Sequence, residues 1–242
     1  MGIKGIVFDL YGTLVDIETD ESMEEIYRAI GNFLTYKGIN IHPDEVRELY
    51  YQLLKQEKEK SKEKYPEISV EAVWKAFLAG HVMRGRSGCH ELALTLAHLY
   101  RAISRKRLQL YPSVKRVLDE LQSRYRMGII SDGQPCWLLP EMKALGLDTY
   151  FDPVIVSADY GFRKPEPRLI EKSLDAMGVT SSEVLFVGND MYRDIYGARQ
   201  LHIKTIFFMS NQGRQSYSDT TADYVAAEFG DVLKGVRFFT QR

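Results

Sequence analysis

The sequence has few cysteines, no long apolar run and almost no net charge. Its two cysteines, Cys89 and Cys136, match neither a metal-binding spacing nor a disulfide framework, which indicates a reducing, cytoplasmic setting. No uninterrupted apolar stretch is long enough to span a bilayer, so we expect no membrane partner. A formal net charge of −1 gives no basic field to attract nucleic acid or an anionic membrane.

What is present is typical of a globular protein. Hydrophobic residues make up 45% of the 242 residues and charged residues 27%. This length suits one large domain or a core with a smaller insertion. We expect a monomer or a homodimer, and the sequence does not decide between them.

Apolar runs with polar ends alternate with helical patterns over much of the chain. Alternation of this kind predicts an α/β fold in which helices cover both faces of a parallel sheet. The predicted strands are residues 3–8, 127–133, 154–158, 184–190 and 204–208, followed by a short strand and a closing helix at the C-terminal end.

From about Ile17 to Arg107 the pattern is helical only. Apolar residues repeat at helical spacing in four segments, and Pro43 is a typical first residue for the second of them. No strand is predicted inside this block. We interpret residues 16–107 as an all-α insertion that interrupts a sheet domain made of residues 1–15 and 108–242.

Polar residues follow the predicted strands. In a parallel sheet, ligands bind beyond the carboxyl ends of the strands, so these residues can converge on one crevice. Each residue by itself is better explained as a turn former or a helix N-cap, so the functional argument rests on the joint pattern. The residues are Asp9, Ser131, Asp132, Lys164, Asn189 and Asp190.

This set suits phosphoryl transfer. A carboxylate such as Asp9 can act as a nucleophile that divides a difficult transfer into two easier steps. The phosphoryl charge must then be offset, and Mg²⁺ does so through hard oxygen ligands such as the Asp9 and Asp190 carboxylates. Lys164 and Ser131 can hold the remaining phosphoryl oxygens. Asp194 lies four residues after Asp190 and, on a helix, faces the same side.

Four motifs in order carry a family resemblance over nearly all of residues 1–235. They resemble the motifs of the haloacid dehalogenase-like (HAD) superfamily, and the helical insertion resembles the cap of one branch of it. The resemblance implies a Rossmann-like core with a mobile helical cap. The motifs are DLYGTL, ISDG, RKPEPRLI and VGNDMYRDIYGA.

The resemblance also assigns roles to residues. It implies that Asp9 is the nucleophile, that Thr13 supports the first loop, and that Lys164 stabilises the transferring group. Substrate contacts are expected at Thr13, Ser131, Asp132, Gly133 and Lys164, catalytic roles at Asp9, Tyr11, Ser131, Lys164 and Asp194, and metal contacts at Asp9, the Tyr11 carbonyl, Asn189 and Asp190.

Tyr11 departs from the usual phosphatase pattern. HAD phosphatases mostly carry a second Asp there as general acid and base, whereas haloacid dehalogenases carry Tyr in a similar DxYGT stretch. Tyr is a poor base near neutral pH because its ordinary pKa is about 10. Tyr11 therefore favours a dehalogenase or an unusual phosphatase, with the proton-transfer role unfilled or filled by another group such as Asp132.

The fourth motif favours the phosphatase. Asp190 and Asp194 together with Asp9 repel one another unless a cation is present, which indicates Mg²⁺. Either Asn189 or Asp190 can be the first metal position.

We therefore predict a Mg²⁺-dependent hydrolase of small phosphorylated metabolites that works through an aspartyl-phosphate on Asp9. The alternatives are a metal-free 2-haloacid dehalogenase using the same Asp9, a phosphotransferase or mutase, and a weakly catalytic phosphometabolite-binding protein.

Overall fold

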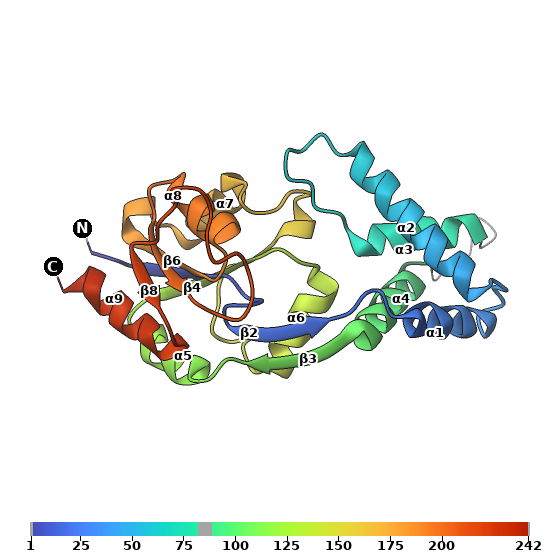
Figure 1. The fold of residues 1–242 in the computed structure, drawn as a ribbon, viewed down its shortest axis with the longest axis horizontal. Coiled ribbons are helices and arrows are strands. Elements are labelled where there is room, and N and C mark those ends of the chain that lie inside the picture. Colours follow the sequence, from blue (N-terminus) through green and yellow to red (C-terminus); the bar gives the residue numbers. More distant parts are fainter. Residues whose placement is uncertain (1, 82–88, 242) are drawn as a thin grey trace.

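The structure is a computed structural model and describes residues 2–81 and 89–241. Two units lie along the long axis of the molecule (Figure 1). The sheet unit holds both termini and consists of a six-stranded sheet with its flanking helices. The helical unit, made of helices α1–α4 of residues 24–104, forms the other end.

In the described part of the chain, the large sheet is wholly parallel, which confirms the predicted α/β fold. Strand β1 is central, and its last residue, Phe8, pairs with Ile129 of β4 and Val187 of β6. The strands, in their order across the sheet, are β5 (Val154–Val156), β4 (Arg126–Ser131), β1 (Gly5–Phe8), β6 (Val184–Gly188), β7 (Lys204–Phe208) and β8 (Tyr224–Ala226).

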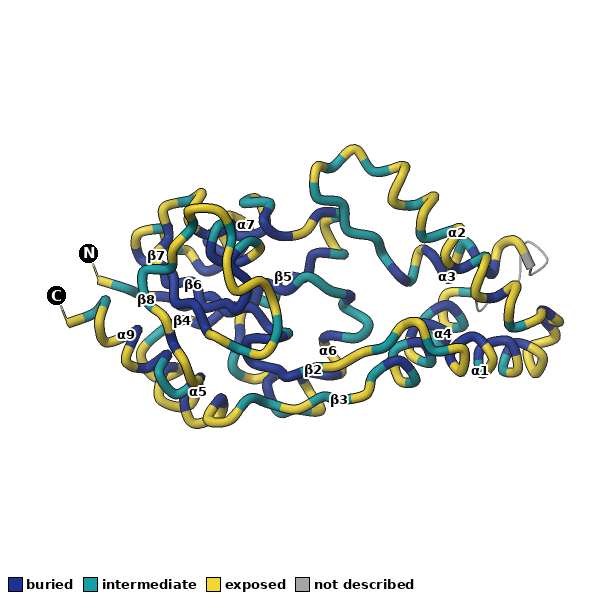
Figure 2. Tube along the Cα trace, viewed as in Figure 1, coloured by how far each residue is buried: buried dark blue, intermediate teal, exposed yellow. Residues whose placement is uncertain are grey.

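Helices cover both faces of this sheet. Ile6 and Phe8 pack on one face and Val7 on the other, so β1 is apolar throughout and wholly buried (Figure 2). Helices α5 (Val114–Gln122), α6 (Pro135–Ala144) and α9 (Val232–Thr240) pack on the first face, and α7 (Pro167–Met177) and α8 (Gly197–Arg199) on the second. Shorter turns are η1 (Ser157–Asp159), η2 (Ser181–Glu183), η3 (Met191–Tyr196, a π-helix) and η4 (Phe229–Asp231).

The helical unit has a hydrophobic cluster of its own, built around Trp74, Tyr50 and Tyr100. The Trp74 ring stacks on Tyr50 with 4.8 Å between ring centroids. All four predicted helices are present, and His42 with Pro43 opens the second through a capping box. Their bounds are α1 (Glu24–Thr35), α2 (Pro43–Lys60), α3 (Val70–His81) and α4 (Cys89–Ser104).

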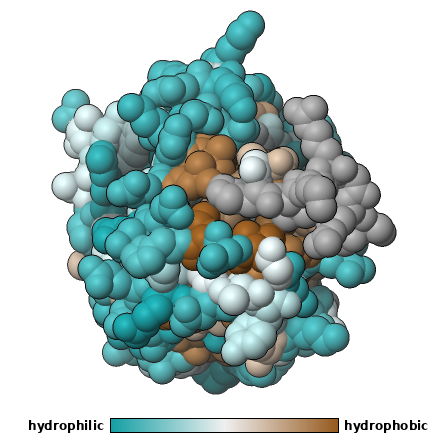
Figure 3. Space-filling view, turned by 90° about the vertical axis from the view of Figure 1, so that its right-hand side faces the viewer, coloured by the Kyte–Doolittle hydropathy of each residue, from teal (hydrophilic) through white to brown (hydrophobic). Residues whose placement is uncertain are grey.

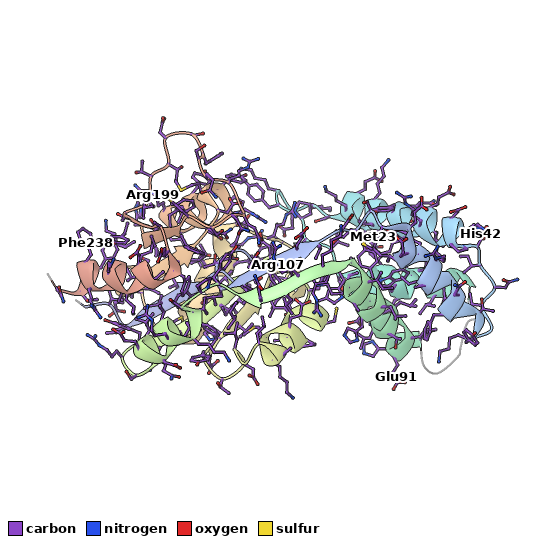
Figure 4. All side chains as sticks on the ribbon, turned by 60° about the horizontal axis from the view of Figure 1, so that its bottom comes forward. Met23, His42, Glu91, Arg107, Arg199 and Phe238 are labelled. Atoms are coloured by element: carbon purple, nitrogen blue, oxygen red, sulfur yellow. The ribbon has the colours of Figure 1, made fainter. Side chains whose placement is uncertain are left out.

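The prediction of no strand between Ile17 and Arg107 is wrong. Strand β2 (Val15–Thr19) pairs antiparallel with β3 (Arg105–Leu110), and this ribbon joins the two units (Figure 1). It carries charged side chains instead of an apolar run, and ion pairs cross it. Arg107, midway between the units in Figure 4, contacts Asp16 at 2.9 Å and Glu18 at 2.7 Å. The predicted domain boundaries fall inside β2 and β3, and the division into domains stays a prediction.

The outer end of the helical unit has a mixed surface. Figure 3 shows apolar side chains near the middle of this face, with hydrophilic side chains around them. Within residues 2–81 and 89–241, no helix combines the length and the apolar character that crossing a membrane requires.

Replacing Trp74 with Ala tests whether this cluster stabilises the chain. Because Trp74 is fully buried, Trp74→Ala should lower the free energy of unfolding by about 3–5 kcal/mol, through lost burial and the cavity left behind. Urea titration followed by circular dichroism measures the change.

Tyr36→Ala is the matched control, because Tyr36 belongs to the same unit and is 89% exposed. Its effect should stay within about 0.5 kcal/mol. Equal effects of the two substitutions would contradict the packing described here.

Candidate active site

The ends of β1, β4 and β6 bring three predicted site residues to one edge of the sheet. Asp9, Ser131 and Asn189 each lie at or directly after the last residue of a strand, and the three strands are neighbours. The Asp9 amide still donates to the Val187 carbonyl at 2.9 Å, which continues the ladder one residue beyond β1. The position of the Asp9 backbone is therefore fixed by the sheet.

Lys164 lies at the centre of this edge. Its Nζ is 2.6 Å from Asp9 Oδ1 and 2.7 Å from Asp194 Oδ1, and it also donates to the Ile130 carbonyl. Burial alone would lower the pKa of Lys164, but the charges of Asp194 and Asp9 outweigh it and raise that pKa. Lys164 is therefore a permanent buried cation held between two carboxylates.

The first loop holds the other Asp9 oxygen. The Thr13 hydroxyl is 2.9 Å from Asp9 Oδ2 and 3.1 Å from Asn189 Oδ1. Gly12 has a φ of +89°, and a Cβ there would collide with the Asn189 amide. This loop packs directly on Asn189, the residue that follows β6. The Thr13 hydroxyl therefore connects Asp9 with Asn189.

Asp194 is wholly enclosed beneath Lys164. Its Oδ2 accepts hydrogen bonds from the amides of Asn189 at 3.1 Å and Asp190 at 3.0 Å. Burial raises the pKa of Asp194 to about 6, with Lys164 opposing the shift and Asp9 adding to it. Asp194 thus orients both Lys164 and the turn after β6.

Asp190 is turned away from Asp9. Its carboxylate caps the π-helix η3 by accepting from the amides of Tyr192 and Arg193. It also accepts from Arg193 Nε at 3.0 Å and from the Arg214 amide at 3.1 Å. Of the two candidate metal positions, only Asn189 contacts the loop that holds Asp9.

The donors near Asp9 suit a hard cation in type. Within residues 2–81 and 89–241, no three acidic, histidine or cysteine side chains form a metal-binding group. The hard oxygens that share this edge are the carboxylates of Asp9 and Asp194 and the amide oxygen of Asn189. These are ligands that Mg²⁺ accepts.

Two polar atoms beside this edge have no hydrogen-bond partner. Ser131 Oγ and Asp132 Oδ2 are both buried, whereas Asp132 Oδ1 accepts from the Lys164 amide at 3.0 Å. Burial raises the pKa of Asp132 despite the nearby charge of Lys164. Unpartnered buried polar atoms are costly, so the pair indicates a position for a polar ligand.

The Tyr11 side chain belongs to a buried network of hydrogen bonds and ion pairs that the sequence analysis did not predict. Its hydroxyl donates to Glu141 Oε2 at 2.5 Å, and Arg101 of α4 pairs with both Glu141 oxygens at 2.8 and 3.0 Å. Arg105 adds a contact at 3.2 Å. Burial and the Glu141 charge raise the pKa of Tyr11 well above its ordinary value. The Tyr11 hydroxyl therefore stays protonated near neutral pH and is poorly suited to act as a general base.

A cavity of about 450 Å³ lies between the two units. Asp132 and Gly133 line it from the sheet unit, and Tyr50 and Glu67 line it from residues of the insertion. Its size suits a small organic molecule.

The position of Glu141 in the sequence could have indicated a buried ion pair. It lies three residues after Leu138 and directly before Met142, on the buried side of α6. An acid at an apolar helix position requires a cationic partner, which long-range packing then supplies through Arg101.

The family model for haloacid dehalogenase-like hydrolases matches residues 3–202. The chain belongs to this family.

Several curated relatives are similar to this chain. The glyceraldehyde 3-phosphate phosphatase of Methanocaldococcus jannaschii is 26% identical over 97% of this chain and 99% of its own length. That of Pyrococcus abyssi is 40% identical, with the match covering 40% of this chain and 41% of the relative. The Pyrococcus furiosus protein of the same name is 34% identical over 51% of this chain, which spans about half of that relative.

Solved structures share the fold. A 2-haloacid dehalogenase from Pseudomonas syringae superposes with a TM-score of 0.69, at 22% identity, over 96% of this chain and 97% of the other. A HAD phosphatase from Thermococcus onnurineus gives 0.61 at 23% identity, over 97% and 98%.

Glu141→Gln tests the buried network through pH. Burial opposes ionisation of Glu141, but Arg101 outweighs it, so the folded-state pKa of Glu141 lies below its unfolded value of about 4.3. The stabilisation is present above pH 4.3 and is lost as the pH falls through the folded-state pKa. Glu141→Gln should cost about 3–5 kcal/mol at pH 7 and flatten the acid loss.

Glu171→Gln on the exposed side of α7 is the control and should follow the parent chain. Unfolding free energies between pH 7 and 3 provide the measurement. A Glu141→Gln deficit that stays constant across this range would contradict the ion pair.

Proposed function

We propose that this chain is a hydrolase of small phosphate monoesters in which Asp9 takes up the phosphoryl group as an aspartyl-phosphate. The observation that carries the proposal is the position of Asp9 against the buried ammonium of Lys164, beside the unpartnered hydroxyl of Ser131. A fixed carboxylate, a fixed cation and a free hydroxyl are what transfer of an anionic group to an enzyme nucleophile requires.

The residues divide the work between them. An Asp9 oxygen attacks phosphorus and the ester bond breaks, after which water attacks the aspartyl-phosphate. Lys164 and Ser131 hold phosphoryl oxygens, and Thr13 keeps the Asp9 carboxylate oriented. The relatives named as phosphatases support phosphate monoesters as the substrate class.

We also propose that Mg²⁺ binds at this edge. Of the predicted ligands Asp9, Tyr11, Asn189 and Asp190, the geometry favours Asn189 over Asp190, because four donors already occupy the Asp190 carboxylate. Asp194 positions this edge instead of binding the ion, because Lys164 and two backbone amides already occupy its oxygens. A bound Mg²⁺ would neutralise charge on the phosphoryl oxygens.

The proposal also covers the role of the helical unit and the cellular location of the protein. We propose that the helical unit acts as the cap over the cavity, and that the protein works in the cytoplasm, where its two free cysteines stay reduced. Whether it is a monomer or a homodimer stays a prediction.

A 2-haloacid dehalogenase is the second candidate. Tyr11 favours it, and so does Lys164, which neutralises Asp9 without a metal. The (S)-2-haloacid dehalogenase 4A of Burkholderia cepacia is 25% identical over 84% of this chain. This reaction forms a carboxyl ester on Asp9 and releases halide.

The test is hydrolysis of an aryl phosphate with Mg²⁺ and with excess EDTA. We expect turnover that EDTA abolishes and that Asp9→Asn lowers by at least about 10⁴-fold, because the substitution removes the nucleophile while keeping the shape. Phosphate release is the readout.

Asp148→Asn, in the exposed loop between α6 and β5, is the matched control and should keep full activity. Halide release from a 2-haloacid in EDTA, without phosphate release, would overturn the proposal in favour of the second candidate.

A further inference from the structure

The proposed reaction needs a proton donor, and Tyr11 is poorly placed for that role because its hydroxyl donates to Glu141. When the ester bond breaks, the departing alkoxide must take up a proton. The Tyr11 hydroxyl is already committed to Glu141 at 2.5 Å, and its pKa is raised. Another acid must lie where the leaving group lies.

Asp132 is the candidate, because its Oδ1 accepts from the amide of Lys164, whose ammonium contacts Asp9. It follows Ser131 directly at the end of β4, and it lines the cavity between the two units. Its side chain is about one tenth exposed. Oδ1 is fixed by the Lys164 amide, while Oδ2 is buried without a hydrogen-bond partner. The hydroxyl of the preceding residue, Ser131, is buried and unpartnered as well.

The charges around Asp132 come from several elements. Lys164 and Arg193 favour its ionised form, and the nearest Arg193 nitrogen is 3.8 Å from Oδ2. Asp194 and burial favour the protonated form, and burial is the largest influence on a pKa that lies above the ordinary value. Glu67 faces it from the insertion.

We propose that Asp132 is the general acid and base of this site, in the role that a second Asp of the first motif would have. This inference rests on the proposed phosphatase function and adds to it the residue that moves the proton.

The proton balance closes over one cycle. As Asp9 bonds to phosphorus and the ester P–O bond breaks, the Asp132 carboxyl gives its proton to the departing oxygen, and the alcohol leaves. The Asp132 carboxylate then takes a proton from the water that attacks the aspartyl-phosphate. Inorganic phosphate departs, Asp9 is a carboxylate again, and Asp132 is protonated.

The leaving group provides the test. We compare kcat/KM for an alkyl phosphate, whose alkoxide needs a proton, with 2,4-dinitrophenyl phosphate, whose anion leaves without one. Asp132→Asn should lower kcat/KM by about 10²–10⁴-fold on the alkyl ester and by less than about tenfold on the dinitrophenyl ester. Asp132→Glu should recover part of the alkyl activity.

The pH profile is the second readout and uses the unaltered chain as its reference. On the alkyl ester, kcat/KM of the parent chain should fall as rising pH ionises Asp132, and Asp132→Asn should lose that limb. Asp148→Asn serves as the neutral control, and thermal unfolding checks that each variant is folded.

Glu67 is the rival acid. It lines the same cavity, accepts from the Ser157 hydroxyl at 2.8 Å, and has a pKa raised by burial. The assignment would be overturned if Glu67→Gln, and not Asp132→Asn, lowered kcat/KM selectively on the alkyl ester. It would also be overturned if Asp132→Asn lowered kcat/KM equally on both esters, because an equal loss indicates a role in binding. If the parent chain hydrolyses neither ester, the proposed function itself fails; if it hydrolyses both, the Asp132 outcome concerns this inference alone.

Discussion

The buried ammonium of Lys164 between Asp9 and Asp194 is the interaction on which the active edge depends. Two carboxylates at 2.6 and 2.7 Å from one cation are tolerated in an enclosed site only because each is also held by further donors, from Thr13 in one case and from backbone amides in the other. Removing Lys164 would leave two buried carboxylates without their cation. The ends of β1 and β6 and the loop after β5 are therefore fixed relative to one another before any substrate arrives.

A second buried ion network connects this edge to the helical unit. Arg101 of α4 reaches Glu141 of α6, and Glu141 holds the hydroxyl of Tyr11, two residues after Asp9. The position that a proton-transferring acid would occupy is thus used to join the two units. Proton transfer must then fall to another group at the same edge. The geometry offers the Asp132 carboxyl, whose Oδ2 has no hydrogen-bond partner.

The sheet and the convergence of Asp9, Ser131, Lys164 and Asn189 could be predicted because both depend on short-range patterns. Buried strands are apolar throughout, and parallel strands bring their ends to one edge. The β2–β3 ribbon could not be predicted, since cross-strand ion pairs such as Arg107 with Asp16 and Glu18 stabilise it and leave no apolar run. The roles of Asn189 and Asp190 were equally open. The direction of the Asn189 side chain depends on Thr13, which lies 176 residues away, and that of Asp190 depends in part on Arg214, which lies 24 residues away.

The central claim is that Asp9 carries the reacting group as a phosphoryl ester. The most direct measurement is acid quenching of the protein during turnover of a phosphate monoester, followed by mass spectrometry of the peptide that contains Asp9. The account predicts a phosphoryl group on Asp9 that disappears when the substrate is exhausted. Turnover with an unmodified Asp9, or with the phosphoryl group on another residue, would contradict it.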